Sequence, residues 1–394
     1  MAERSIHMSA AKAVPASPVS SDLSWEAIFA VEAARLRAAL GPSLLAVEHV
    51  GSTAVPGLPA RPILDIGVAV SGAEAVMACL PLLRPWGYAY RETHGAAWEP
   101  SFVGDGPIPI HLYLYPIGSR EWEALLLFRD YMRAEPAAAR RYAACKQALV
   151  VDTAWSNSAY REAKSACIEA ILATARAWQR RQPLDSGRLA SAVQVLAHRD
   201  PHLAAIVAAH GPPPLWQRPP GFATLLAIIL EQQVSLASAQ ATFRRLMALT
   251  DSLSPATFLA LDDATLRAIG FSRQKTTYGR ILAQALLAGE LDLESLTALD
   301  DEDAVRTLTR LKGIGRWTAT IYLLEALLRP DVWPVDDIAL ATAVQKTLGL
   351  PRRPGPTALA PIAEPWRPWR GVAARLFWHA YLEGYWPEAM TAMG

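Results

Sequence analysis

Apolar and polar residues follow two different periods in the two halves of this 394-residue chain. In the first half, four short apolar segments are bounded by Gly, Pro or Ser, which is typical of strands. These segments are residues 43–50, 63–70, 88–92 and 108–115. Helical patterns lie between and after them, so the first half is predicted to be a small α/β or α+β domain.

A helical period of apolar residues dominates from about residue 120 onward. It predicts helices near residues 122–134, 137–149 and 157–179. Residues 182–187 contain Pro183 and Gly187 and break this pattern, and only helical periods follow. We therefore predict a domain over residues 23–181, a linker at 182–187 and an all-α domain over 188–394. Residues 1–22, rich in Ala, Ser and Pro, are expected to form a disordered tail, not a signal peptide.

Composition narrows the class of protein. Hydrophobic residues make up 52% of the chain and charged residues 19%, which is ample for packed cores. No window holds 18 consecutive apolar residues, so no membrane span or membrane partner is expected. The three cysteines are far apart, which argues against a disulfide framework and against a four-cysteine cluster. A cytoplasmic monomer is the default expectation.

Charge gives no sign of nucleic-acid binding. Residues 184–394 carry equal numbers of basic and acidic side chains, so their formal net charge is zero. A protein that binds DNA mainly by neutralising phosphates is usually basic. Any DNA binding by this half must therefore depend on local geometry.

The segment Gly313-Ile314-Gly315 is the first candidate for such geometry. Two glycines around one apolar residue allow a tight turn and let a phosphate approach the backbone. The next helix is predicted to start at Gly315 or Arg316, where its free N–H groups and dipole favour an anion. Lys312 would add a positive charge. An ordinary turn between two helices is the alternative interpretation.

A pair of carboxylates, Asp336 and Asp337, follows about one helix later, just after Pro334. Either aspartate could simply cap the next helix. A carboxylate in this position could also stabilise the positive charge that develops on a sugar when its N-glycosidic bond breaks, and orient the attacking water. One residue can serve both purposes.

Five ordered motifs carry a resemblance to a known family. They are residues 219–225 (PPGFATL), 229–235 (ILEQQVS), 269–275 (IGFSRQK), 311–319 (LKGIGRWTA) and 333–337 (WPVDD). In this order, residues 185–394 resemble the helix-hairpin-helix DNA glycosylases, specifically the 3-methyladenine DNA glycosylase II family.

The resemblance implies a base-excision repair enzyme that acts on alkylated purines in double-stranded DNA without a cofactor. It makes Asp337 the catalytic carboxylate, with Asp336 as the alternative, and places Trp317 against the extruded base. Trp317 also stands where bifunctional relatives carry a lysine nucleophile, which implies a monofunctional enzyme that leaves an abasic site. DNA contacts are expected from the hairpin and from the second and third motifs: Lys312, Gly313, Ile314, Gly315, Gln232, Gln233, Ser235 and Lys275.

Two further motifs, residues 48–66 and 110–131, resemble the GrpB-like family, which is similar to the nucleotidyltransferase fold. A Gly51-Ser52 turn before a strand that carries Asp65 could cradle a triphosphate near a metal-binding carboxylate. Arg61 and His111 are expected in the same site, with nucleotide and magnesium as ligands. The second carboxylate of active transferases is replaced by Gly67.

Alternatives therefore stay open for each half. The first could be a nucleotide-binding or degenerate module, an active transferase or an interaction domain. The second could be a non-catalytic DNA-binding protein that uses the hairpin only to hold phosphate. Leu291–Leu299 and the tryptophans Trp366, Trp369 and Trp378 are interpreted as structural.

Overall fold

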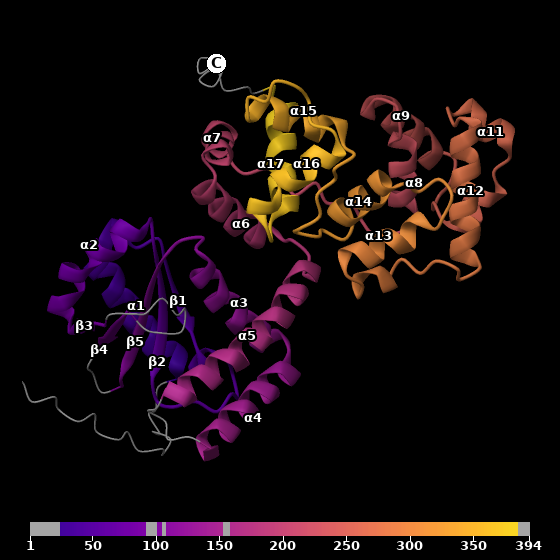
Figure 1. Ribbon diagram of the computed structural model, residues 1–394. Helices are drawn as coiled ribbons and strands as arrows, with labels where there is room; N and C mark the ends of the chain where they lie inside the picture. Colours follow the sequence, from indigo (N-terminus) through magenta and orange to yellow (C-terminus); the bar gives the residue numbers. More distant parts are fainter. Residues whose placement is uncertain (1–23, 92–100, 105–107, 153–157, 385–394) are drawn as a thin grey trace, which may run out of the picture. The chain divides into compact units, whose positions relative to one another are not determined.

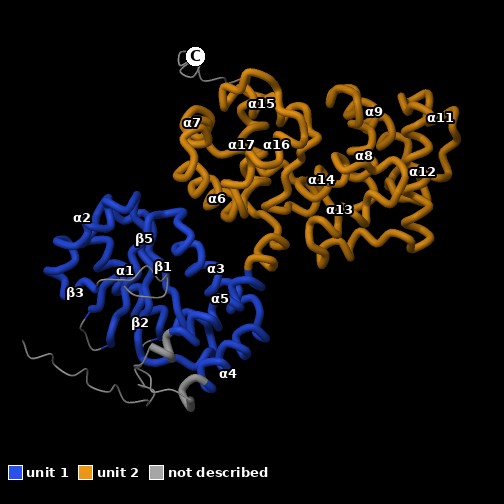
Figure 2. The backbone as a smooth tube through the Cα atoms, viewed as in Figure 1, with its two compact units in different colours: residues 1–175 blue, residues 176–394 orange. Residues whose placement is uncertain are grey.

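The computed structural model describes residues 24–91, 101–104, 108–152 and 158–384 (Figure 1). The chain divides into two compact units, Met1–Ala175 and Arg176–Gly394 (Figure 2). The predicted tail at residues 1–22 lies outside the described residues. No helix within the described ranges is both long and apolar enough to cross a membrane.

The first unit is built on a five-stranded sheet in the order β1-β2-β5-β4-β3. Strands β2 and β5 pair in parallel, and the other neighbours are antiparallel. Its strands are β1 (Ala46–Val50), β2 (Leu64–Val70), β3 (Tyr88–Tyr90), β4 (Phe102–Gly104) and β5 (Ile110–Pro116). The α/β expectation for this half is confirmed.

Helices cover both faces of this sheet. Its helices are α1 (Trp25–Leu40), α2 (Ala73–Leu83), α3 (Arg120–Ala134), α4 (Pro136–Asp152) and α5 (Ser158–Arg181). Apolar residues of α1 and α2 pack with one face of the sheet in the main core. On the other face, Leu125 of α3 packs with Val50 and Tyr113. Asp65, His111 and Tyr113 alternate onto this second face because strand side chains have a period of two.

Two elements of this unit differ from the sequence prediction. Strand β4, which lies between β5 and β3 in the sheet, was not predicted, because three residues are too short for a detectable alternation. Strand β3 ends at Tyr90, whereas the predicted strand ran to Glu92. Glu92, and Asn157 at the start of the third predicted helix, lie outside the described residues.

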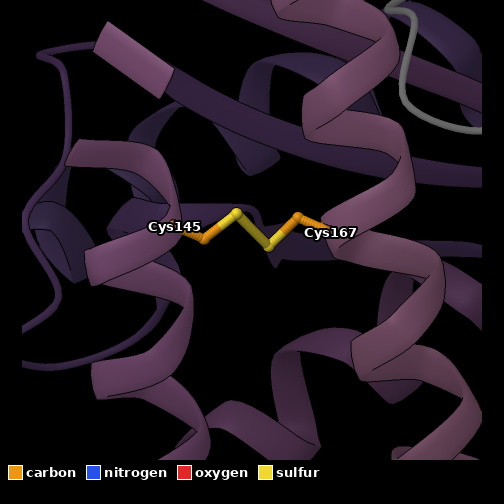
Figure 3. Close-up of a disulfide and its surroundings, with 2 residues drawn as sticks. All are labelled: Cys145 and Cys167. Carbon is orange, nitrogen blue, oxygen red and sulfur yellow. A yellow bond between two sulfur atoms is a disulfide. The ribbon is translucent and has the colours of Figure 1, made fainter. Parts of the chain in front are cut away.

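A disulfide joins Cys145 on α4 to Cys167 on α5 (Figure 3). The sequence analysis, which argued against a disulfide framework, did not anticipate this single bond. The two residues are 22 positions apart in sequence, but they lie on successive helices whose Cα atoms approach to 6.9 Å at this point. Spacing along the chain could not reveal that approach. Cys79 is free and buried.

Counting thiols tests this disulfide. The full chain, denatured without a reductant, is expected to expose one reactive thiol, that of Cys79. Treatment with a dithiol reductant should raise the number to three, the total in the sequence. A Cys145→Ser variant should expose two thiols without reduction, since Cys167 loses its partner. Three reactive thiols in the untreated parent chain would contradict the disulfide.

The second unit is all-helical over its described residues, as predicted. Its helices are α6 (Ser186–Arg199), α7 (Pro201–His210), α8 (Phe222–Glu231), α9 (Leu236–Met247), α10 (Pro255–Ala260), α11 (Asp263–Ala268), α12 (Arg273–Leu287), α13 (Asp301–Thr309), α14 (Arg316–Glu325), α15 (Ile338–Thr347), α16 (Pro356–Ile362) and α17 (Arg370–Leu382). They form two hydrophobic cores, one from α8 to α14 and the other from α6, α7 and α15 to α17. Trp378 of α17 packs against both cores.

The break in helical pattern at residues 182–187 corresponds to the step from α5, which ends at Arg181, to α6, which begins at Ser186. Asp185 caps α6 by accepting a hydrogen bond from the N–H of Arg188. Leu184 is buried in the second core of this unit, and its N–H donates to the carbonyl of Leu328. This segment is therefore packed against the second unit.

Candidate active site and DNA-binding surface

A groove of about 1430 Å³ is lined by residues from both cores of the second unit. The core of α8 to α14 contributes the hairpin at residues 311–315 and Trp317. The segment before α15 contributes Asp336 and Asp337, and α17 contributes Trp378. The groove thus brings together two motifs that are about twenty residues apart in sequence.

The segment that carries Asp337 is fixed by buried polar contacts. Asp331 is fully buried, and its carboxylate accepts hydrogen bonds from Arg367 and Arg370 at 2.8 to 3.2 Å. The indole N–H of Trp333 donates to the carbonyl of Leu359 at 3.2 Å. These contacts hold the segment just before the bend at Pro334, which leads into α15.

Asp337 is the N-cap of α15. Its Oδ1 accepts from the N–H of Leu340 at 2.7 Å and from the indole N–H of Trp378 at 3.1 Å. Its Oδ2 accepts from the indole N–H of Trp317 at 2.8 Å. Two tryptophans from two different helices therefore hold one carboxylate in the groove. Trp378 was interpreted as structural from the sequence, and its contact with Asp337 could not be predicted, because it exists only in the folded chain.

Asp336 also lines the groove but is exposed. Of the two aspartates, Asp337 is the one that the indoles hold, and it also caps the helix. Trp317 is half-buried and lines the groove beside it.

The two glycines of the hairpin have different surroundings. Gly313 has a φ of +103°, and a Cβ built on it would overlap the ring of Tyr278. Gly315 is the N-cap of α14, has an ordinary φ of −86°, and a Cβ there would meet nothing within 4 Å. Gly313 is thus required for folding, whereas Gly315 leaves the helix N-terminus open to a ligand. Lys312 beside them is exposed, and Ile314 is buried in the core.

A matched pair of alanine substitutions separates these two roles. Gly313→Ala is expected to destabilise the protein by about 2 kcal/mol or more, because of its φ and the overlap with Tyr278. Gly315→Ala should change stability by less than about 0.5 kcal/mol and weaken duplex DNA binding. Chemical denaturation and fluorescence anisotropy measure the two effects. Equal destabilisation by both substitutions would contradict this division.

The remaining predicted DNA contacts fall into two groups. Gln233 is exposed at the groove with a φ of +57°, and Ser235 in the groove caps α9. Gln232 is half-buried, and its amide N–H groups donate to the Gly313 carbonyl and to Thr318 Oγ1, both at 2.8 Å. Gln232 therefore supports the hairpin from the neighbouring helix pair.

Lys275 is placed elsewhere by the structure. It is absent from the described lining of the groove, and its ammonium donates to the carbonyl of Leu230 near the end of α8. Burial lowers the pKa of this lysine. The last carbonyls of a helix lack partners within the helix, and Lys275 supplies one. Its predicted contact with DNA stays a prediction.

Several groove residues were missed by the sequence analysis. Exposed apolar side chains gather at the groove, including Val234 at 45%, Leu236 at 53% and Ile338 at 66% exposure. A contiguous set of exposed apolar residues usually marks a binding surface. Val234 directly follows Gln233, within a motif that the sequence analysis singled out. Only the structure reveals that its side chain is exposed at the groove.

An ionic triad also lies in the groove. Arg218 forms ion pairs with Glu231 at 2.9 Å and with Glu325 at 2.7 Å. Burial raises the pKa of the Glu325 carboxyl to about 7, against the effect of the Arg218 charge. With Asp336, Asp337 and Lys312 added, carboxylates outnumber cations among the described groove residues.

In the first unit, the other predicted residues lie near one of their number, the carboxylate of Asp65. Asp65 on β2 pairs in register with His111 on β5, and their side chains approach to 3.4 Å between Oδ1 and Nδ1. Gly51 has a φ of +72°, and a Cβ there would overlap the Asp65 carboxylate. Ser52 Oγ accepts a hydrogen bond from Lys146 on α4. Arg61, which is exposed, is near enough to lower the pKa values of Lys146 and Lys164.

Tyr113 belongs to the same cluster and was not predicted. Its hydroxyl donates to Asp65 Oδ1 at 3.1 Å, and burial together with the Asp65 charge raises the pKa of this phenol. Lys146 and Lys164 were missed as well, because they come from helices far along the chain.

This cluster does not fit a magnesium ion. Magnesium in nucleotide enzymes is usually held by more than one carboxylate or by carboxylate and phosphate together. The position two residues after Asp65 is Gly67, where a Cβ would already lie 3.1 Å from the Trp122 ring. A second carboxylate has no room there. Within the described residues, no group of three or more acidic, histidine or cysteine side chains could hold a metal.

Comparison with known proteins assigns both units. Residues 17–174 match the GrpB family, described as GrpB protein. UPF0157 protein BH1888 of Halalkalibacterium halodurans is 36% identical over 157 residues, 40% of this chain and 80% of that protein. UPF0157 protein YqkA of Bacillus subtilis is 32% identical over 157 residues, but the chain spans only 46% of its length.

Residues 226–368 match the HhH-GPD superfamily of base excision DNA repair proteins. DNA-3-methyladenine glycosylase 1 of Schizosaccharomyces pombe is 30% identical over 158 residues, 39% of this chain and 69% of that protein. The solved 3-methyladenine DNA glycosylase Mag1 of the same yeast, in complex with abasic DNA, is 27% identical and covers 49% of this chain and 98% of its own, with a TM-score of 0.46. The chain therefore belongs to the GrpB family in its first unit and to the HhH-GPD superfamily of base excision DNA repair proteins in its second.

Proposed function

We propose that the second unit is a monofunctional DNA glycosylase that hydrolyses the N-glycosidic bond of alkylated purines in double-stranded DNA and leaves an abasic site. One observation carries the proposal. The Asp337 carboxylate is held by Trp317 and Trp378 in the groove that also contains the glycine hairpin.

The proposed reaction follows from this arrangement. The open helix N-terminus at Gly315 and the exposed Lys312 hold a backbone phosphate near the groove. The target nucleotide leaves the base stack and enters the groove, which costs least for a damaged base pair. Asp337 then stabilises the positive charge that develops on the sugar and orients the attacking water. Hydrolysis of this kind requires water and no cofactor.

The groove's aromatic and acidic lining supports a cationic base as substrate. Purines alkylated at a ring nitrogen carry a positive charge, and an indole face attracts cations. Trp317, Trp378 and Trp216 all line the groove, together with an excess of carboxylates. A neutral base gains less from both features. The same lining supports 3-methyladenine-type lesions as substrates, as in the relatives named above.

The residues that line the groove also support a monofunctional enzyme, which releases the base without cleaving the DNA strand. Cleavage of the DNA strand by a glycosylase requires an amine that forms a Schiff base with the sugar. Lys312 is the one lysine in the described groove lining, and it lies in the hairpin that is proposed to contact phosphate. Trp317 occupies the position of the lysine nucleophile in bifunctional relatives.

Incubating the full chain with methylated duplex DNA tests the proposal. The expected products are free alkylated purines and intact strands with abasic sites, with no protein–DNA adduct after borohydride treatment. Duplex binding without base release would favour the alternative, a non-catalytic DNA-binding protein. A borohydride-trapped adduct would overturn the monofunctional assignment while leaving a glycosylase.

A further inference from the structure

Trp216 lines the groove in a backbone conformation that bulky residues rarely adopt. Its φ is +46°, in the left-handed region that favours glycine. In the described part of the chain, three non-glycine residues have a positive φ, and two of them, Trp216 and Gln233, line the groove. Strained residues of this kind persist only where the surrounding structure fixes them, and they cluster at sites of function. The strain at Trp216 therefore requires fixed points on both sides of the residue.

The fixed point before Trp216 is the side chain of Arg375 on α17. Its guanidinium donates to the carbonyl of Leu215 and, at 2.6 Å, to the carbonyl of Leu324 in the last turn of α14. Because Arg375 is fully buried, losing either acceptor would leave a buried donor without a partner. The residue before Trp216 is thereby tied to the end of α14.

The fixed point after Trp216 is Arg218, which contacts the same end of α14. Its N–H donates to the Glu325 carbonyl at 2.8 Å, and its guanidinium pairs with the Glu325 carboxylate at 2.7 Å. The guanidinium also pairs with Glu231, the last residue of α8, at 2.9 Å. Trp216 therefore lies between two anchored positions, and its backbone cannot relax without breaking these contacts.

The groove-lining face of α14 relates Trp216 to Asp337. Three residues of this helix, Trp317, Ile321 and Glu325, follow one another at four-residue intervals and all line the groove. Trp317 donates to Asp337 near the start of the helix. Glu325 lies eight residues further, about 12 Å along the helix axis. A nucleotide whose sugar lies at Asp337 therefore has room along this wall for a base that extends towards Trp216.

Helix α17 makes a second connection between Trp216 and Asp337. The indole of Trp216 contacts the ring of His379, with ring centroids 6.4 Å apart. His379 directly follows Trp378, whose indole N–H donates to Asp337 Oδ1. Trp216 is thus held against both helices that supply the tryptophan partners of Asp337.

We propose that Trp216 is a base-binding residue, whose indole contacts the far edge of the extruded, positively charged purine. The assignment rests on the proposed glycosylase function and adds to it a contact that neither the hairpin nor Asp337 provides. An indole face attracts a cation that lies within about 6 Å of the ring centre. Because the backbone around Trp216 is fixed before the base arrives, little conformational freedom is lost when the two meet.

Single-turnover base release from a duplex with one 7-methylguanine tests the assignment. Trp216→Leu should lower the rate about 3- to 30-fold, because leucine removes the ring but keeps an apolar side chain and the same strained backbone. Trp216→Phe keeps an aromatic ring and should lose less. Trp369→Leu is the matched control, because Trp369 is also half-buried but is absent from the described lining of the groove. Thermal melting checks that each variant folds.

Binding to a duplex with an abasic site separates contact with the base from a structural role, because this duplex has no base at the site. Trp216→Leu should bind it within about threefold of the parent chain, since phosphate contacts are unchanged. Parent-like base release by Trp216→Leu, an equal loss of release in Trp369→Leu, or a parallel loss of abasic-site binding would overturn the assignment. Absence of base release from the parent chain would instead refute the proposed function itself.

Discussion

Replacing Asp337 by asparagine is expected to lower the rate of base release from methylated DNA by about 10²–10⁴-fold. Asparagine has nearly the same shape, and its side-chain oxygen can still accept the cap hydrogen bond from Leu340 and the indole N–H of Trp378. The negative charge is lost, however, and with it the stabilisation of the cationic sugar and the base for the attacking water. Single-turnover base release measures the change.

Binding provides the control for this substitution. Affinity for undamaged duplex DNA should stay within about threefold of the parent chain, because the hairpin that is proposed to hold the phosphate is untouched. Asp336→Asn is the matched variant, since Asp336 is the exposed neighbour in the same groove. It should lower the rate much less. Parent-like base release by Asp337→Asn, or an equal loss in Asp336→Asn, would refute the assignment to Asp337.

Replacing Asp331 by alanine is expected to destabilise the second unit by about 3–5 kcal/mol. The Asp331 carboxylate is fully buried and accepts hydrogen bonds from Arg367 and Arg370. Its removal leaves the largely buried guanidinium of Arg370, exposed by only 17%, without its main acceptor. In calorimetry of the full chain, the midpoint temperature of unfolding of the second unit should decrease by roughly 10 °C.

Glu364 offers a close control, because it contacts the same two arginines from the surface. Its side chain is 53% exposed, and it forms ion pairs with Arg367 and Arg370. Exposed ion pairs contribute less than about 1 kcal/mol, so Glu364→Ala should have a small effect. Equal destabilisation by the two substitutions would show that burial of Asp331 is not what stabilises this segment. The segment leads to Asp337, so the Asp331→Ala variant should also lose base release.

The sequence predicted much of the fold because the relevant signals are local. Strand β2 is an apolar run interrupted by Asp65, and the break at Pro183 fell between α5 and α6. Strand β4 was missed since three residues carry too little pattern, and its pairing with β5 depends on distant residues. The disulfide was missed for a related reason, because only the packing of α4 against α5 brings Cys145 and Cys167 together.

The same distinction between local signals and contacts of distant residues applies to the candidate site. The hairpin and Asp337 were predicted because glycine spacing and a helix cap after proline are local features with specific chemistry. Trp378 and Glu325 gave no such signal. The first becomes part of the site through a hydrogen bond to a residue 41 positions away, and the second through burial beside Arg218. Lys275 was predicted from the sequence as a DNA contact, whereas in the structure its ammonium donates a hydrogen bond to the carbonyl of Leu230 near the end of α8.

By itself, the sequence determined the two kinds of domain and the break in helical pattern between α5 and α6, and it supplied the hairpin and carboxylate motifs as predictions. Periodicity and turn chemistry act over a few residues, so one chain is enough to read them. The tertiary structure alone decided which aspartate the tryptophans hold, that Gly313 and Gly315 serve different purposes, and that His111 and Tyr113 contact Asp65. Each of these depends on contacts between segments whose distance in space the spacing along the chain does not encode.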